Sequence, residues 1–168
     1  KNKAFKPLSL SLALAAAAFG FATIVPAADH LDRVARTGVL QVCIWPEYYG
    51  ISWRDPATQQ LSGLDVEMAR ELAHDLQARP RFVDSSFARL IDDLEADRCD
   101  IAMFAIGITP ARAEKLRFTA PHLVSDIYAI TTKSNRRIRQ WDDIDKPGMV
   151  VAVAKCTLHE PIMRDKLR

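Results

Sequence analysis

Short apolar runs alternate with amphipathic stretches along most of the chain, a pattern typical of α/β proteins. Strands are predicted where apolar and β-branched residues cluster: 39–44, 81–83, 100–106, 126–132 and 149–153, with a hairpin formed by 51–54 and 60–61. Helices are predicted where apolar residues recur every three or four positions, or where capping residues stand: 30–36, 65–77, and stretches that start at 86, 109 and 157. The expected helix caps are Asp29, Asp65, Ser86 and Thr109.

The alternation of strand and helix predicts an α/β fold with a parallel sheet and crossover connections. We expect a first lobe at 29–133, which includes a first crossover strand. Residues 134–148 begin with a polar, basic stretch that is typical of a linker. The pattern then restarts, but a single strand and helix cannot cover both faces of a sheet. Residues 149–168 are therefore expected to be the start of a second, incomplete lobe.

Residues 1–28 have the three parts of a secretory signal peptide. Three lysines form a basic start, an apolar run extends from 8 to 25, and the segment ends in small residues at Ala27 and Ala28. The competing interpretation is a transmembrane anchor, since the run approaches the ~20 residues that span a bilayer. Because the middle of the run is rich in alanine and only mildly hydrophobic, we expect a cleaved leader and an exported, periplasmic protein.

Charge and cysteine content narrow the classes of function. The chain has 23 basic and 21 acidic residues, and three of the bases lie in the leader, so the body lacks the basic excess that nucleic acid would need. The count of three cysteines leaves at least one thiol unpaired in an oxidising compartment. Cys43 and Cys99 suit a disulfide if their strands are neighbours, and two small buried thiols otherwise. No cysteine or histidine spacing indicates zinc, so neither a metal nor a cofactor is expected.

The segment after the 100–106 strand has the chemistry of an anion site. In open parallel sheets, ligands bind beyond the carboxyl ends of the strands. Thr109 and Pro110 start a helix there, whose free N–H groups and positive dipole end attract an anion. Arg112 is unfavourable beside that dipole unless the site receives an anion, which a guanidinium binds through two parallel hydrogen bonds. Gly107 would let the backbone approach that anion. A solvated surface arginine is the alternative interpretation.

Catalytic signals are weak. The histidines are scattered, and the chain has neither a Gly-x-Ser-x-Gly elbow nor a glycine loop that could hold phosphate. The aromatic residues between 45 and 53 suit either stacking on a ligand or packing in the core. These absences are only weak evidence against an enzyme, since acid/base sites need no local signature.

Several short motifs occur in a recognisable order: 40–48, Gly63-Leu64-Asp65, 100–103, Ile108-Thr109-Pro110-x-Arg112, Phe118-Thr119-x-Pro121, Asp143-Ile144 and 150–153. Together they resemble the amino-acid-type extracellular solute-binding family, the periplasmic receptors of ABC importers, over residues 31–167. The resemblance implies the type II periplasmic binding protein fold, in which two α/β lobes close on a small polar solute.

The resemblance also implies a set of binding residues. Arg112 would clamp the α-carboxylate of the ligand, Ala105 and Gly107 would offer backbone contacts, Tyr48 would cover the ligand, and Thr157 would contribute from the second lobe. Trp45 and Phe104 stand where many members have polar residues, so a cationic amino acid is not supported. The expected ligand-binding residues are therefore Arg112, Gly107, Ala105, Tyr48, Thr157, Trp45 and Phe104.

Two departures from the family pattern accompany this expectation. Cys156 occupies a position that is usually glycine, where a side chain could hinder close approach of the backbone. The family's acid for the ligand amine is expected beyond Arg168, so the chain resembles a truncated reading frame, and residues 29–168 are expected to bind amino acids weakly or not at all. The function implied is capture of an amino acid or related small carboxylate for an ABC permease. The alternatives are a cyclohexadienyl (arogenate) dehydratase on the same fold and the sensor module of a receptor kinase.

Overall fold

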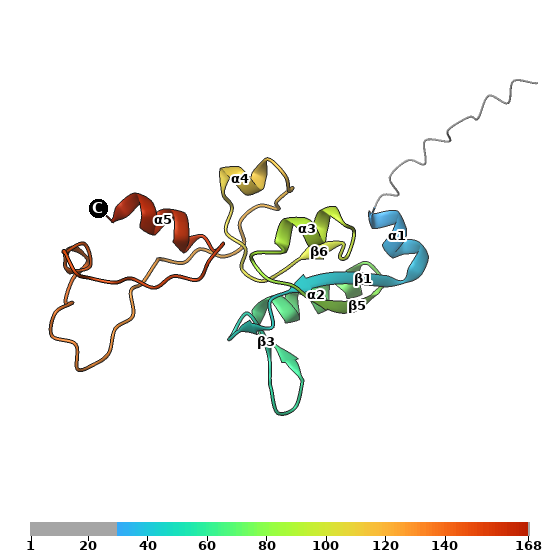
Figure 1. The fold of residues 1–168 in the computed structure, drawn as a ribbon. Coiled ribbons are helices and arrows are strands. Elements are labelled where there is room, and N and C mark those ends of the chain that lie inside the picture. The colour runs from blue at the N-terminus through green and yellow to red at the C-terminus, as the bar shows by residue number, and fades with distance from the viewer. Residues whose placement is uncertain (1–29, 168) are drawn as a thin grey trace, which may run out of the picture.

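The computed structural model describes residues 30–167 of the chain (Figure 1). In chain order its elements are α1 (His30–Thr37), β1 (Val39–Ile44), β2 (Glu47–Tyr48), β3 (Ser52–Arg54), β4 (Leu61–Ser62), α2 (Leu64–Asp75), β5 (Arg79–Asp84), α3 (Leu90–Glu95), β6 (Ile101–Ala102), α4 (Pro110–Ala113), the 3-10 helix η1 (Trp141–Asp143) and α5 (His159–Lys166). The expected signal peptide at 1–28 and the expected cap Asp29 lie outside the described residues.

The predicted parallel sheet is confirmed. β1 lies between β5 and β6 and pairs with both in parallel, so that Val42 is level with Phe82 on one side and with Ile101 on the other. α2 precedes β5 and α3 connects β5 to β6, as parallel neighbours require a crossover. The predicted hairpin forms part of a second, antiparallel sheet in the order β2-β3-β4. This arrangement is the α/β fold that the sequence predicts.

The side chains of β1 build a core on each face of the parallel sheet. On one face Leu40, Val42 and Ile44 pack against α1 and α2. On the opposite face Cys43 packs with α3 and with Phe104. Successive side chains of a strand point to opposite faces, and both faces of β1 are covered. This explains why the strand is an almost continuous apolar run instead of an alternating one.

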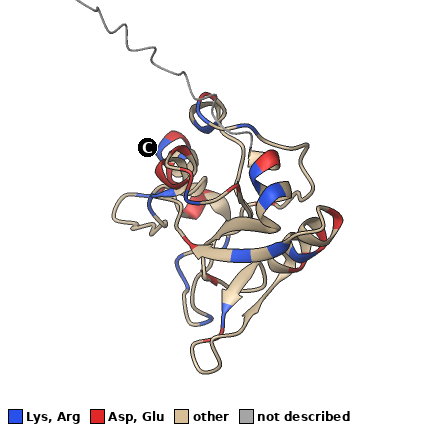
Figure 2. Ribbon diagram, turned by 90° about the vertical axis from the view of Figure 1, so that its right-hand side faces the viewer, with Lys and Arg blue, Asp and Glu red and all other residues tan. Residues whose placement is uncertain are grey.

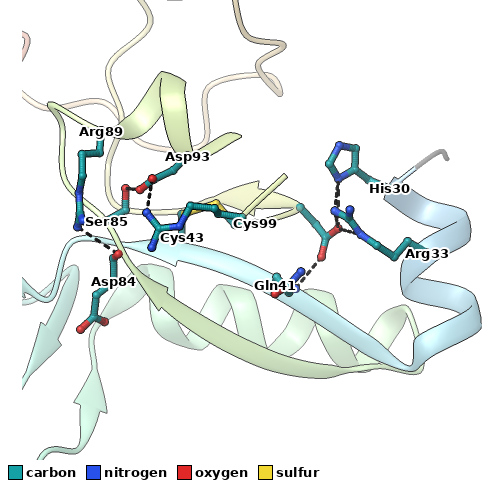
Figure 3. The surroundings of a disulfide bond; sticks show 11 residues. His30, Arg33, Gln41, Cys43, Asp84, Ser85, Arg89, Asp93 and Cys99 are labelled. Carbon is teal, nitrogen blue, oxygen red and sulfur yellow. Dashed lines mark hydrogen bonds and ion pairs between the residues drawn. A yellow bond between two sulfur atoms is a disulfide. The ribbon is translucent and has the colours of Figure 1, made fainter. Parts of the chain in front are cut away.

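A disulfide joins Cys43 of β1 to Cys99, which precedes β6 (Figure 3). Both side chains are fully buried in the core on the α3 side of the sheet. Because β1 and β6 are neighbours, the condition that the sequence set for this bond is met, and the alternative of two buried thiols is wrong. Cys156 is the free cysteine and is exposed.

A buried carboxylate holds α1 against the sheet. Arg33 and His30 of α1 lie near Gln41 of β1 (Figure 3), and all three contact the Asp100 carboxylate, whose side chain is 3% exposed. Burial alone would raise the pKa of this carboxyl. The hydrogen bonds from Arg33, from the Gln41 backbone and from His30 have a larger combined effect, and the net pKa is below its ordinary value. Asp100 is therefore held in its ionised form where α1 meets the start of β6.

Two predicted helix caps are wrong. α2 begins at Leu64, and Asp65 is a buried residue inside its first turn that does not cap it. α3 begins only at Leu90, and the carbonyl of Ser86 instead accepts a hydrogen bond from the Arg89 N–H at 3.0 Å. The Ser86 carbonyl thus closes a turn before the helix, while its side chain caps nothing.

Three predicted strands are shortened or missing. The strand expected at 100–106 is reduced to β6, and Ala105, inside the expected range, has a φ of +49°, a left-handed conformation that is incompatible with a strand reaching 106. The segments 126–132 and 149–153 form no strand in the described structure. Ile130 and Val150 are 96% and 92% exposed. These segments have suitable residues but no paired neighbour among residues 30–167.

Acidic and basic residues are interleaved along the described ribbon (Figure 2). No helix between residues 30 and 167 combines the length and hydropathy of a membrane span. In the same part of the chain, no three histidine, cysteine or acidic side chains gather in a way that could hold a metal ion.

Candidate ligand-binding site

Loops that follow the three parallel strands bring aromatic side chains together at one edge of the sheet. Trp45 follows β1, Phe87 follows β5 and Phe104 follows β6. The centroid of the Trp45 ring lies 5.4 Å from that of Tyr48 and 5.3 Å from that of Phe87, and the Phe87 and Phe104 centroids are 5.0 Å apart. All are edge-to-face contacts, the arrangement that aromatic pairs favour. We call these four residues the aromatic cluster. It stands where open α/β sheets bind ligands.

Arg112 lies against the aromatic cluster. Thr109 caps α4 as predicted, since its Oγ1 accepts a hydrogen bond from the Arg112 N–H at 3.2 Å. The guanidinium carbon lies 5.6 Å from the centroid of Phe87. Nη1 donates to the Gly107 carbonyl at 2.7 Å, and Nη2 donates to the Cys156 carbonyl at 2.9 Å. Arg112 is 8% exposed, so the alternative of a solvated surface arginine is wrong.

The charge of Arg112 has no carboxylate within ion-pair distance among the described residues; its two side-chain hydrogen bonds are to carbonyl oxygens. Burial lowers the pKa of Arg112, with the nearby Cys156 acting in the opposite direction. A guanidinium nevertheless stays protonated in proteins, because its ordinary pKa is far above neutrality. It has five N–H donors, so these bonds leave donors for a ligand. The arrangement suits an incoming anion, which would neutralise a costly buried cation.

The C-terminal part of the chain reaches the same place. A Cβ atom on Gly107 would lie 2.9 Å from Cδ2 of Leu158, so the glycine permits this close approach. Thr157 is buried, and its hydroxyl donates to the Ala154 carbonyl at 2.6 Å. Residues 156–158 therefore bring Thr157 into the neighbourhood of Gly107 and Arg112.

Cys156 leaves the backbone contact with Arg112 intact. Its φ is +63°, a conformation that glycine adopts more easily, and its side chain is exposed. Its N–H donates to Oε2 of Glu160 at 2.7 Å, while its carbonyl accepts from Arg112. The side chain that was expected to hinder the backbone thus does not prevent the contact between the Cys156 carbonyl and Arg112.

Two predicted site residues lie differently from expectation. Phe104 is fully buried in the core on the α3 side, so its ring has no exposed surface in this structure, whereas the sequence predicted that it lines the ligand. The Ala105 N–H donates to Oδ2 of Asp65 at 2.6 Å, so this donor is already engaged within the protein. Trp45 and Tyr48 remain half-buried at the edge of the cluster.

Sequence reasoning missed Phe87, Asp65 and His122 as members of this region. Phe87 could have been found, because β5 ends at the same sheet edge as β1 and β6. Asp65 was interpreted as a helix cap, although it is a buried carboxylate beside Ala105. His122 lies 3.6 Å from Oδ1 of Asp65, and no local pattern indicates a contact between segments so far apart in the sequence.

Comparisons with known proteins agree with this geometry. Residues 40–166 match the family of bacterial extracellular solute-binding proteins, family 3. Cyclohexadienyl dehydratase of Pseudomonas aeruginosa is 32% identical over 99% of this chain and 62% of its own length. A probable amino-acid ABC transporter-binding protein of Haemophilus influenzae is 29% identical over 83% of this chain and 54% of its own length. The chain thus spans between half and two thirds of the length of these two relatives.

Solved structures show the same relationship. An ancestral amino acid-binding protein, a precursor of cyclohexadienyl dehydratase, superposes with a TM-score of 0.77 at 30% identity, over 82% of this chain and 60% of that chain. An ancestral cyclohexadienyl dehydratase superposes with a TM-score of 0.54 at 37% identity, over 58% of this chain and 40% of that chain. With its parallel sheet, its arginine at the sheet edge and the family match over most of its length, the chain belongs to family 3 of the bacterial extracellular solute-binding proteins.

Proposed function

We propose that this chain forms the amino-acid-binding part of a periplasmic receptor for an ABC importer, and that Arg112 binds the carboxylate of the ligand. The observation that carries this proposal is the buried guanidinium, which lies beside Phe87 and has carbonyl partners but no carboxylate among the described residues. A guanidinium favours a carboxylate through two parallel hydrogen bonds. A free amino acid supplies that anion at neutral pH.

The aromatic cluster supports an apolar or aromatic ligand side chain. Trp45 and Tyr48 are half-buried, so each retains ring surface that a ligand can cover. Edge-to-face and stacked contacts with such rings add to the affinity beyond the area they bury. The four rings of the cluster contact one another edge to face, so the surface that they offer is aromatic and favours an apolar ligand group.

Ligand capture would involve two lobes. Residues 29–133 would form the first lobe, 134–148 the linker, and 149–168 the start of the second. The bond from Arg112 to the Cys156 carbonyl and the contact of Leu158 with Gly107 support a meeting of the two parts at the binding site. Closure around the ligand would be a hinge motion that brings 156–158, with Thr157, to the carboxylate.

Export and delivery complete the proposal. The family consists of extracellular proteins, and the N-terminal segment 1–28 has the pattern of a cleavable leader. The relative from Haemophilus influenzae is a probable amino-acid ABC transporter-binding protein. We therefore infer a periplasmic location and a membrane permease of the ABC class as the partner that receives the ligand.

Calorimetric titration with a panel of L-amino acids tests the role of Arg112. Replacement by alanine removes a charge-assisted pair, so Arg112→Ala should lose about 1.5–3 kcal/mol of binding free energy, roughly a ten- to 150-fold rise in Kd. Arg117→Ala is the matched control, because Arg117 is exposed, and it should bind as the wild type does. Unchanged affinity in a folded Arg112→Ala protein would refute the carboxylate clamp.

A second candidate function is that of a cyclohexadienyl dehydratase. It is favoured by the 32% identity to the Pseudomonas aeruginosa enzyme over 99% of this chain. Incubation with prephenate or arogenate would reveal the activity through the absorbance of an aromatic product. Turnover would establish the enzyme, whereas amino-acid binding without turnover supports the receptor.

A further inference from the structure

Asp65 is a buried carboxylate that stands beside the proposed binding site without touching Arg112. The residue is 1% exposed and lies in the first turn of α2. Its Oδ2 accepts a hydrogen bond from the Ala105 N–H at 2.6 Å. Its Oδ1 is buried and has no hydrogen-bond partner. Buried polar atoms are normally paired, so an unpaired carboxylate oxygen calls for an explanation.

The bond to Ala105 fixes the loop that holds the guanidinium. Ala105 has a φ of +49°, which is unfavourable for a residue with a Cβ and persists only when the surroundings hold it. Two residues later, the Gly107 carbonyl accepts the hydrogen bond from Nη1 of Arg112 at 2.7 Å. Asp65 therefore acts on Arg112 through the loop 105–107.

The same turn of α2 also holds the connection between β2 and β3. The N–H of Asp65 donates to the Ile51 carbonyl and that of Leu64 donates to the Gly50 carbonyl, both at 3.0 Å. The chain is so close here that a Cβ on Gly63 would lie 2.4 Å from the Ile51 oxygen. Helix N–H groups and the helix dipole also favour a negative charge at this turn. The first turn of α2 thus links the β2–β3 connection to the loop 105–107, whose Gly107 carbonyl holds Arg112.

His122 is the titratable group that faces the unpaired oxygen. Its Nε2 lies 3.6 Å from Oδ1 of Asp65, and its side chain is 45% exposed. Neither group has another ion-pair partner among residues 30–167. The other charged groups on the surrounding elements are engaged or exposed: Glu67 pairs with Arg70, Arg112 bonds two carbonyls, and Glu47 and Arg117 are exposed.

We propose that Asp65 is the positioning residue of the binding loop and that His122 is its pH-dependent partner. A protonated imidazole makes a stronger, charge-assisted hydrogen bond to a carboxylate than a neutral one does. Histidine ordinarily changes charge between pH 5 and 8. Below that range His122 would satisfy Oδ1 and hold Asp65 and Ala105 firmly. Above it the loop would open more often. The effect on ligand affinity rests on the proposed function, whereas the effect on the loop does not.

Amide hydrogen exchange of Ala105, measured by NMR between pH 5.5 and 8, tests this positioning. After correction for the intrinsic exchange rate, protection should be roughly two- to fivefold higher at pH 5.5, the size expected of a partly exposed ion pair. His122→Gln should abolish this dependence. His74→Gln, which removes a largely exposed histidine from the same helix α2, should preserve it. A wild-type pH profile in His122→Gln, or its loss in His74→Gln, would overturn the proposal.

The variant Asp65→Asn distinguishes the loss of the Asp65 charge from a general loss of structure. Asparagine keeps an oxygen for the Ala105 N–H but removes the charge, so protection should become independent of pH while the amides of β1 keep their protection.

Titration with L-phenylalanine over the same pH range separates the two proposals. If it binds, its affinity should fall as the pH rises. A pH-dependent Ala105 with no binding by any amino acid would support the positioning without supporting the receptor. Amino-acid binding together with an Ala105 protection that does not change with pH would support the receptor and reject the positioning.

Discussion

Residues 30–113 and 114–167 contain similar sequence patterns but differ in how far those patterns become structure. β1 and the segment 149–153 are both short, β-branched, apolar runs. β1 is paired on both sides, and Val42 is fully buried. The later segment is unpaired in the described structure, and Val150 is 92% exposed. A strand-forming sequence therefore needs a neighbouring strand and a covering layer before it becomes a strand.

The helices differ in the same way. α2 buries Val66, Ala69 and Ala73 against the sheet, whereas α5 has no buried residue. Helix stability in proteins comes mainly from packing of the apolar face. The first region thus supplies its own packing partners, while the contacts of the second include Leu116 against the first region's core, the bond from Arg112 to Cys156 and the local bonds of η1. We expect substitutions in the two regions to have very different costs.

The largest contrast should come from apolar truncation. Phe104→Ala removes a fully buried ring and should lower the free energy of unfolding by about 3–5 kcal/mol. Ile130→Ala removes a side chain that is 96% exposed and should change it by no more than about 0.5 kcal/mol. Urea unfolding followed by circular dichroism measures both. Equal costs would show that the second region packs as tightly as the first.

Loss of the disulfide should be the next largest effect. The Cys43–Cys99 bond closes a loop between residues separated by 56 positions, and its removal should cost about 2–5 kcal/mol. The double change Cys43→Ala with Cys99→Ala, compared by urea unfolding with the wild type, measures this cost. Cys156→Ala is the control, because this free cysteine is exposed. A reductant that leaves the wild type as stable as before would contradict the structural role of the bond.

Asp100 should give a smaller effect that depends on pH. Asp100→Asn removes the acceptor for Arg33 and His30 and should cost about 1–3 kcal/mol at pH 7. The pKa of this carboxyl is lower in the folded protein than its ordinary value of 3.8. The stability it contributes is therefore present above about pH 4 and lost as the pH falls through the folded pKa. Urea unfolding of both proteins at pH 7 and pH 3 should show curves that converge in acid.

The sequence predicted the fold of the first region well, because its elements bury their own apolar faces. The parallel sheet, the hairpin and the Thr109 cap follow from local pattern. The caps Asp65 and Ser86 failed for different reasons: the Asp65 carboxylate lies inside the first turn of α2 and binds the Ala105 N–H, whereas α3 begins only at Leu90, beyond the reach of Ser86. The strand expected at 100–106 was too long, because alanine is not a residue type that indicates a left-handed conformation, and the sequence around Ala105 gave no other sign of one.

The candidate site was predictable only in part. Arg112 could be singled out, because an arginine in the first turn of a helix opposes the dipole and so calls for an anion. Its actual partners, the carbonyls of Gly107 and Cys156, depend on how distant segments meet. The same holds for Phe87, which reaches the aromatic cluster from β5, and for the pair of Asp65 and His122. Contacts of this kind are set by the topology and carry no local signature.

The smallest effect on global stability is expected within the second region, at η1. The side-chain hydrogen bond from Lys146, with the backbone N–H groups of Arg139 and Gln140, lowers the pKa of Asp143 from 3.8 to about 2. The ionised carboxylate therefore stabilises η1 above about pH 4, and this contribution is lost only as the pH falls through about 2. Lys146→Ala should raise the Asp143 pKa towards 3.8, as an NMR titration of its carboxyl carbon would show. Lys133→Ala, in an exposed turn, should leave the Asp143 pKa unchanged. Because the first region supplies most of the packing, neither change should move the midpoint of urea unfolding. A clear shift of that midpoint with Lys146→Ala would mean that η1 belongs to the same cooperative unit as the sheet.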